Sequence, residues 1–224
     1  MIIIMLGAPG SGKGTVGGLL GEMLNIIHIS SGEIFRSYIR KHDDLGNKIA
    51  SYINKGELVP DELVIKLVEK RLQEKDAESG VILDGYPRTE KQAVELDRML
   101  AEMGKKADIA VNLVISDEEI IDRIINRRTC PNPDCREIYN LKFKPPKVEN
   151  ICDKCGEILI IRDDDNLETV RERLKNYHEI SESLIKYYAR KDILYSVKTN
   201  THSNKTAADT AEEIKRYLSD NHQI

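Results

Sequence analysis

The strongest constraint on the fold of this chain is a glycine-rich loop near its start, Gly7-Ala8-Pro9-Gly10-Ser11-Gly12-Lys13-Gly14-Thr15. An apolar run at residues 2–6 precedes it and is typical of a buried strand, and the helix-compatible stretch 16–24 follows. Glycines let backbone N–H groups turn inward around an anion, and a helix start adds its positive dipole end. Lys13 can bridge terminal phosphates, and the Thr15 hydroxyl can meet phosphate or Mg²⁺. The segment therefore predicts a phosphate-binding loop between a strand and a helix.

A second informative segment is Asp84-Gly85-Tyr86-Pro87-Arg88-Thr89, which follows a short apolar run at residues 81–83. Phosphate-loop enzymes keep a Mg²⁺-associated aspartate at the end of such a strand. Gly85 and Pro87 favour a turn, and Arg88 after it can bind a phosphate through two parallel hydrogen bonds. We therefore expect Asp84 and Arg88 to lie on the same edge of the sheet as the loop.

All four cysteines fall in one segment as two pairs, Cys130-x4-Cys135 and Cys152-x2-Cys155, with 16 residues between the pairs. In a chain without an export signal, such clustering favours a metal site over disulfide bonds. Two cysteine pairs on tight turns offer four thiolates in a tetrahedron, as in structural zinc sites. The segment therefore predicts one structural zinc ion per chain.

The bulk composition narrows the class of protein. A chain of 224 residues with 32% charged and 40% apolar residues suits one α/β domain with insertions. Its net charge of −4 provides no basic field for nucleic acid or an anionic membrane, and its apolar runs are too short to span a bilayer. The N-terminus reads as a first strand rather than a signal peptide. We expect a cytoplasmic monomer.

The rest of the chain alternates predicted strands and helices. We expect further strands at residues 26–29, 107–115 and 193–197, and helices at 45–54, 62–75, 90–103, 167–189 and 206–218. Polar residues at helix starts are candidate N-caps, namely Ser31, Asp61 and Thr89. Spacing alone supports capping by Ser31 and a solvated charge at Arg36 as well as it supports binding roles.

Arg123 and Arg127 are four residues apart on a helix expected to begin near Asp117, so they should share one face. Two aligned arginines most often form a solvated face, and their spacing alone favours that interpretation.

These motifs together resemble nucleoside monophosphate kinases, and the long-lid, zinc-bearing adenylate kinases in particular. The resemblance rests on the Gly-x-Pro-Gly-x-Gly-Lys-Gly-Thr loop, the Asp-Gly-Tyr-Pro-Arg-Thr segment, and the lid segments Phe143–Lys147 and 162–165. It implies a doubly wound parallel sheet of the P-loop NTPase type. It also implies three parts: a core at 1–29, 60–127 and 163–224, an AMP-binding insertion at 30–59, and a zinc-bearing lid at 128–162.

The activity implied by the resemblance is Mg²⁺-dependent phosphoryl transfer, ATP + AMP ⇌ 2 ADP. The residues implied in ATP binding are Gly10, Ser11, Gly12, Lys13, Gly14, Thr15, Arg123 and Arg127. Those implied in AMP binding are Ser31, Arg36, Val59, Gly85, Arg88, Gln92, Arg162 and Arg173. The implied catalytic set is Lys13, Asp84, Arg88, Arg123, Arg127, Arg162 and Arg173. For Arg162 and Arg173, simple pairing with nearby acidic residues is the alternative.

Two departures from the family pattern affect these expectations. The first cysteine pair has four intervening residues where two are common, which makes Cys130 the least supported zinc ligand. The connector Lys198–Thr201 lacks the glycine that usually lies beside the donor adenine.

Three other functions compete with adenylate kinase. A GTPase would need an Asn-Lys-x-Asp motif, but the Asn-Lys pairs at 47, 54 and 204 have Ala50, Glu57 and Ala207 at the fourth place. A non-catalytic zinc-ribbon binding protein would account for the cysteines but for no other motif. The negative net charge of the chain also opposes nucleic-acid binding. A kinase for UMP, CMP or GMP shares every phosphate motif and stays open.

Overall fold

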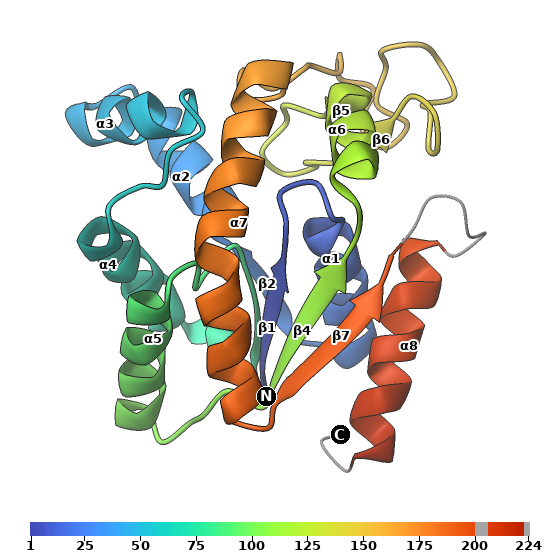
Figure 1. The fold of residues 1–224 in the computed structure, drawn as a ribbon. Coiled ribbons are helices and arrows are strands. Elements are labelled where there is room, and N and C mark those ends of the chain that lie inside the picture. Colours follow the sequence, from blue (N-terminus) through green and yellow to red (C-terminus); the bar gives the residue numbers. More distant parts are fainter. Residues whose placement is uncertain (200–205, 222–224) are drawn as a thin grey trace.

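The computed structural model describes residues 1–199 and 206–221. Five parallel strands form one sheet in the order β2-β3-β1-β4-β7 (Figure 1). The strands are β1 (Ile2–Gly7), β2 (Ile27–Ser30), β3 (Val81–Asp84), β4 (Ile109–Val114) and β7 (Leu194–Lys198). The order places β1, which leads into the glycine-rich loop, in the middle of the sheet. The predicted α/β class with a parallel sheet is confirmed.

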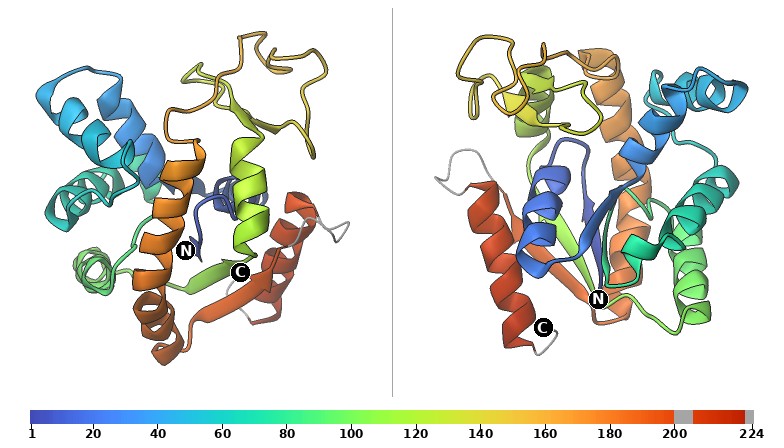
Figure 2. Two further views of the ribbon diagram at one scale, coloured as in Figure 1. Left: turned by 45° about the horizontal axis from the view of Figure 1, so that its top comes forward. Right: turned by 180° about the vertical axis from the view of Figure 1, so that it is seen from behind.

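Helices cover both faces of this sheet, as Figure 2 shows. One face is covered by α1 (Lys13–Leu24) and α8 (Ala207–Asp220). The other is covered by α4 (Asp61–Leu72), α5 (Glu90–Glu102) and α7 (Leu167–Arg190). Side chains of β1 alternate between the two buried faces, because successive residues of a strand point in opposite directions. A parallel strand buried on both faces needs the continuous apolar run seen at the start of the sequence.

Two segments extend from this sheet-and-helix core. The first holds α2 (Ser31–Ile39) and α3 (Asp44–Ile53). A short 3₁₀ helix, η1 (Lys75–Ala77), lies outside this segment, after α4. The second follows α6 (Asp117–Ile125) and begins with the antiparallel hairpin of β5 (Arg127–Thr129) and β6 (Ile138–Asn140). We call residues 128–162 the lid segment. It lies at the top of Figure 1, above the carboxyl ends of the strands.

Two of the three expected N-caps are wrong. Ser30, not Ser31, is the N-cap of α2, and the Ser31 hydroxyl donates to the carbonyl oxygen of Gly85 (2.8 Å). Pro60 is the N-cap of α4, so Asp61 is the first residue of that helix. In both cases the polar side chain is engaged with the segment after β3 rather than with its own helix. Thr89 is confirmed as a cap, because its side chain accepts from Gln92 N.

The expectation that Arg123 and Arg127 share one helix face is also wrong. α6 ends at Ile125, and the chain turns at Asn126 into the lid hairpin, so Arg127 belongs to β5. The side chain of Asn126 donates to Asp122 O (2.8 Å), which satisfies a carbonyl at the helix end. A helix that included Arg127 would have to continue two residues beyond the observed end at Ile125.

Candidate active site

The carboxyl ends of β1, β2 and β3 meet at one edge of the sheet. The strand register pairs Asp84 with Met5 on one side and with Ser30 on the other. A cavity of about 1020 Å³ opens over this edge. The predicted site residues that line it are Gly10, Ser11, Gly12, Lys13, Gly14, Thr15, Ser31, Arg36, Asp84, Gly85, Arg88, Arg123, Arg127, Arg162 and Arg173. The fold thus brings together residues from both ends of the sequence.

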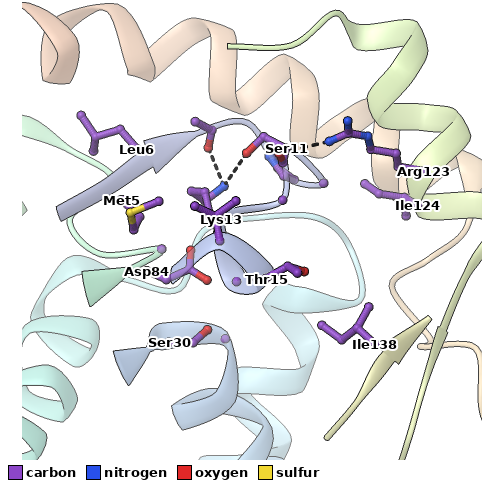
Figure 3. A pocket seen from close by; sticks show the side chains of 18 of the residues that line it. Met5, Leu6, Ser11, Lys13, Thr15, Ser30, Asp84, Arg123, Ile124 and Ile138 are labelled. Carbon is purple, nitrogen blue, oxygen red and sulfur yellow. Dashed lines mark hydrogen bonds between the residues drawn. The ribbon is translucent and has the colours of Figure 1, made fainter. Parts of the chain in front are cut away.

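The glycine-rich loop wraps around the Lys13 ammonium group, as Figure 3 shows. Lys13 Nζ donates to the carbonyl oxygens of Gly7 (2.7 Å) and Ala8 (2.8 Å). Gly10 has a φ of +82°, and a Cβ at this position would come within 2.8 Å of Ile124 side-chain atoms. A side chain at Gly10 would therefore separate the loop from α6. The close packing of Gly10 against Ile124 holds the loop in place without using the inward-facing backbone N–H groups that would bind an anion.

Burial is the main reason why the pKa of Lys13 falls from 10.5 to about 8. The Asp84 carboxylate opposes that fall, while Arg88, Arg173 and Arg127 add to it by charge repulsion. Several cations in one cavity raise each other's free energy, and an anion between them relieves the repulsion. The charge pattern therefore favours a polyanionic ligand.

The arginines that line the cavity are held by acidic side chains, by backbone carbonyls or, for Arg162, by the Thr129 hydroxyl (3.1 Å). Arg127 forms a bidentate pair with Asp165, and Arg173 donates to Asp164 (2.6 Å). Burial lowers the pKa of Arg162 to about 9, with repulsion from neighbouring arginines as a further cause. The expected alternative of pairing with nearby acids is therefore present for Arg173, yet its guanidinium still lines the cavity.

Arg88 and Arg123 are fixed by carbonyl oxygens. Arg88 Nε donates to Gly85 O (2.9 Å), and Arg123 Nη1 donates to Ser11 O (3.2 Å), which links α6 to the loop (Figure 3). Burial lowers the pKa of Arg88 to about 10, and the nearby Arg173 lowers it further. These contacts leave guanidinium N–H groups of both arginines available to an anion in the cavity.

Asp84 lies beside Lys13 at the floor of the cavity (Figure 3). Burial raises the pKa of its carboxyl group, but the contact with His28 Nε2 (3.7 Å) and the charge of Lys13 lower it more. Asp84 is therefore ionised at neutral pH, as an aspartate associated with a hydrated Mg²⁺ ion must be.

Comparison with known proteins agrees with this geometry. A family model described as adenylate kinase matches residues 5–193. The chain belongs to the adenylate kinase family. An adenylate kinase from Pseudothermotoga lettingae is 44% identical over 219 residues, which are 98% of this chain and 100% of that protein. One from Archaeoglobus fulgidus is 51% identical over 197 residues, covering 88% of this chain and 90% of that protein. One from Acetivibrio thermocellus is 46% identical over 219 residues, or 98% of each chain.

Among the described residues predicted for nucleotide binding in this family, Val59 and Gln92 do not line the cavity. Val59 is buried in the apolar core, in the same cluster as side chains of α2 and α4. Gln92 is 1% exposed, its Oε1 accepts from Arg88 N (2.7 Å) and its Nε2 donates to Asp61 Oδ1 (2.6 Å). Since a backbone N–H can only donate and a carboxylate can only accept, these partners fix the orientation of the amide.

The four cysteines of the lid segment come together in one cluster, with all their sulfur atoms within 4.8 Å of one another. Two of the distances are 3.4 Å, from Cys130 to Cys155, and 3.6 Å, from Cys135 to Cys152. Four sulfurs at ~2.3 Å from a zinc ion are separated by about 3.8 Å in a tetrahedron. The donor set and its spacing therefore fit zinc. Cys130, which its sequence spacing left least supported, belongs to the same cluster, with its sulfur atom 3.4 Å from that of Cys155.

Protonation within this cluster also suits a metal. Burial opposes ionisation of Cys152, but hydrogen bonding to the Tyr139 hydroxyl and to backbone N–H groups lowers the pKa of that thiol to about 6. Thiolates are the form that binds zinc. Burial instead raises the pKa of Cys130 to about 12, so binding of a metal there would release a proton.

Several residues that line the cavity were not predicted from the sequence, among them His28, Glu33 and Arg136. None of them belongs to a recognisable motif, and only their tertiary contacts reveal them. The donor-side connector lies partly outside the described residues, which end at Thr199 and resume at Thr206. Within the described parts of the chain, no helix is long and apolar enough to cross a membrane.

Proposed function

We propose that this chain catalyses reversible Mg²⁺-dependent phosphoryl transfer between ATP and AMP to give two ADP. The observation that carries the proposal is one cavity with two sets of phosphate-binding groups. The glycine-rich loop and Lys13 form one set, and Arg36 and Arg88 line the same cavity from elements after β2 and β3. Two sets of cations in a common cavity suit two nucleotides whose phosphates face each other.

The proposed roles follow this division. The loop, with Lys13 and Thr15, holds the donor phosphates together with Arg123, which already contacts the loop at Ser11 O. Arg36 and Arg88 hold the acceptor phosphate, near the Ser31–Gly85 contact. Arg127, Arg162 and Arg173 then neutralise the charge that is spread over the phosphoryl group in transit, in a cavity to which all three contribute.

No side chain is needed as a nucleophile, because the acceptor is itself a phosphate oxyanion. Catalysis then consists of aligning the two nucleotides and stabilising charge that develops in the transition state. The lid segment contributes Arg136, Tyr139, Phe143 and Lys144 to the cavity lining. We propose that its closure excludes water, which would otherwise accept the phosphoryl group.

Adenylate kinases use Mg²⁺ with ATP, and the residues here fit that ion. An ionised carboxylate at Asp84 and a hydroxyl at Thr15 are hard oxygen donors, both at the cavity floor (Figure 3). Bound Mg²⁺ would neutralise donor phosphate charge. We assign the cysteine cluster to one structural zinc ion, since its four thiols leave no ligand position open for chemistry.

The three-part division of the chain is also a proposal, with the core at 1–29, 60–127 and 163–224, the AMP-binding insertion at 30–59 and the lid at 128–162. We propose a monomer, because one chain supplies both sets of phosphate-binding groups. We propose a cytoplasmic enzyme, because four free cysteines that suit a metal are typical of a reducing compartment.

A kinase for UMP, CMP or GMP is the second candidate, since it needs the same phosphate groups. The names of the relatives favour AMP, because the proteins from Pseudothermotoga lettingae and Acetivibrio thermocellus that cover 98% of this chain are adenylate kinases. A site that hydrogen-bonds one base edge rejects others strongly, since they leave buried groups unpaired.

A panel of acceptors with MgATP tests the proposal. We expect kcat/KM for AMP to exceed that for GMP, CMP and UMP by at least about a hundredfold. Preference for CMP, UMP or GMP would assign the chain to a neighbouring kinase with the same mechanism. Failure to transfer to any of the four nucleotides would contradict the proposal as a whole.

A further inference from the structure

The two cysteine pairs of the lid segment end in the same backbone conformation but in different residues. After Cys155 the chain turns at Gly156 with a φ of +78°, and after Cys135 it turns at Arg136 with a φ of +51°. Glycine adopts this left-handed region readily, whereas a side chain with a β-carbon is disfavoured there. An arginine at a position that suits glycine indicates that its side chain has a role that offsets the backbone strain.

The Arg136 side chain reaches out of the lid toward α2. Its Nη1 lies 3.8 Å from Oε2 of Glu33, which belongs to the first turn of α2. The Nε group of Arg136 donates to Pro133 O within its own turn, which holds the guanidinium in this direction. Arg136 and Glu33 both line the nucleotide cavity. The contact therefore joins the lid segment to the acceptor side of the site.

Glu33 also binds the arginine assigned to the acceptor phosphate. Its other oxygen, Oε1, accepts from Arg36 Nε (2.9 Å) and Arg36 Nη2 (2.5 Å). The carboxylate thus divides its two oxygens between the lid and the acceptor site. Burial opposes ionisation of Glu33, but the charges of Arg36, Arg162 and Arg136 together hold its pKa below the ordinary value. Glu33 is therefore an anion at neutral pH, surrounded by cations.

In this arrangement the electrostatic potential at Arg36 would depend on the position of the lid, although the guanidinium itself stays charged. With Arg136 withdrawn, Arg36 keeps its hydrogen bonds to the Glu33 carboxylate, which then offsets more of the positive charge that the acceptor phosphate needs. With Arg136 in contact, the carboxylate is shared by two guanidinium groups, which leaves more positive charge for the phosphate.

We propose that Arg136 is a positioning residue that acts through Glu33 on Arg36, so that lid closure strengthens binding of the acceptor nucleotide. The inference rests on the proposed assignment of Arg36 to the acceptor phosphate. A ligand on the donor side that holds the lid closed raises acceptor affinity, and linkage requires the reverse effect to be equal.

The experiment measures a coupling factor in the full-length protein. Titration calorimetry gives the Kd of AMP alone and in the presence of Mg²⁺ with a non-hydrolysable ATP analogue, and the factor is their ratio. Arg136→Gly removes the side chain and replaces it with the residue that the backbone favours. Its melting temperature should equal or exceed that of the unmodified protein, so loss of folding does not confuse the result.

We expect Arg136→Gly to lower the coupling factor about two- to fivefold, the range of a partly exposed ion pair. Arg136→Lys, which keeps the charge, should retain most of the factor. Lys147→Ala is the control, because Lys147 is an exposed lid cation outside the cavity, and it should leave the factor unchanged. In the Glu33→Gln background, Arg136→Gly should have no further effect, since the mediating carboxylate is gone.

An unchanged coupling factor in Arg136→Gly would overturn the inference. So would a factor of one in the unmodified protein, or an undiminished effect of Arg136→Gly in the Glu33→Gln background. Failure of the proposed function is distinguishable from these results, because the unmodified chain would then fail to bind AMP at all.

Discussion

The floor and the roof of the nucleotide cavity are held together by different forces. The floor is the glycine-rich loop on β1, whose residues Ile3, Ile4 and Met5 are at most 1% exposed. The roof is the lid segment, whose only buried cluster among the described residues is Cys130, Tyr139, Cys152 and Leu159. Phe143 and Ile158 of the roof are 52% and 66% exposed.

The lid segment is held together by contacts among cysteine sulfurs and by ion pairs rather than by a large apolar core. Besides the cysteine cluster, Glu137 accepts from Lys144 and Lys154. A segment of this size cannot bury enough apolar surface to offset its conformational entropy, and the proposed zinc ion would supply the stability that a core otherwise provides. The comparison predicts that changes in the floor alter chemistry without unfolding, whereas changes in the roof alter stability first.

The largest effect is expected at Lys13 in the floor. Lys13→Ala should lower kcat by at least about a hundredfold, since a charge aimed at the transferred phosphoryl group acts mainly in the transition state. The melting temperature should stay within a few degrees, because the buried apolar core beneath the loop is unaffected. Steady-state kinetics and thermal melts measure both. Turnover near that of the unmodified protein would remove the phosphate-loop assignment.

Removal of zinc is the matching change in the roof. We expect one metal ion per chain, four thiols that react only after chelation, and a clear fall in melting temperature when the metal is removed. The thiolates hold the two turns of the lid together, and their loss leaves few buried apolar contacts there. Activity at low temperature should persist in part, because no predicted phosphate-binding residue is a cysteine. Metal-free protein with two disulfides and unchanged thermal stability would contradict this.

Residues in contiguous motifs could be assigned from the sequence, and residues that act through distant partners could not. Lys13 and Asp84 follow from local spacing, because a strand, a turn and a helix start fix their surroundings. The cluster of four cysteines also follows, since cysteines so close in sequence have few other uses. The parallel sheet was implied by the resemblance to nucleoside monophosphate kinases, and the alternation of predicted strands and helices agrees with it.

Contacts between segments that are distant in the sequence could not be predicted from local motifs and spacing. Gln92 is oriented by Asp61, 31 residues away, so its burial and fixed amide cannot be read from its own helix. Arg136 was missed because its left-handed backbone has no signal in the sequence, where glycine would have been expected. Its partner Glu33 lies in a helix start whose acidic residue reads as ordinary dipole compensation.

Differences within the roof should be smaller than the effect of removing the metal. The unusual spacing of the first cysteine pair predicts that Cys130→Ser costs less stability than Cys152→Ser. The structure instead buries both thiols equally, at 2% exposure, and exposes Cys155. We therefore expect Cys130→Ser and Cys152→Ser to lower the melting temperature alike, and Cys155→Ser to lower it less, because water can take that ligand position. A ranking with Cys155→Ser as the most damaging would contradict this comparison.

The smallest effect is proton uptake at Lys13. In the ligand-free protein its pKa is about 8, chiefly because of burial, so near pH 9 the amine is mostly neutral. Donor phosphates beside Nζ favour the charged form, so binding of ATP near pH 9 should take up close to one proton. Affinity for ATP should accordingly fall as pH rises through about 8. Calorimetry in buffers with different ionisation enthalpies counts the protons.

The lowered pKa of Lys13 also makes the free energy of unfolding depend on pH. Between about 8 and 10.5 the unfolded chain holds the proton that folded Lys13 has lost, so this residue makes stability rise with pH in that window. Lys13→Ala should abolish both the rise in stability with pH and the proton uptake on ATP binding. The lid segment does not contain Lys13, so its thermal stability should not change. Buffer-independent binding heats near pH 9 in the unmodified protein would show that Lys13 keeps its proton in the empty cavity, and that burial in the floor is offset by the Asp84 carboxylate.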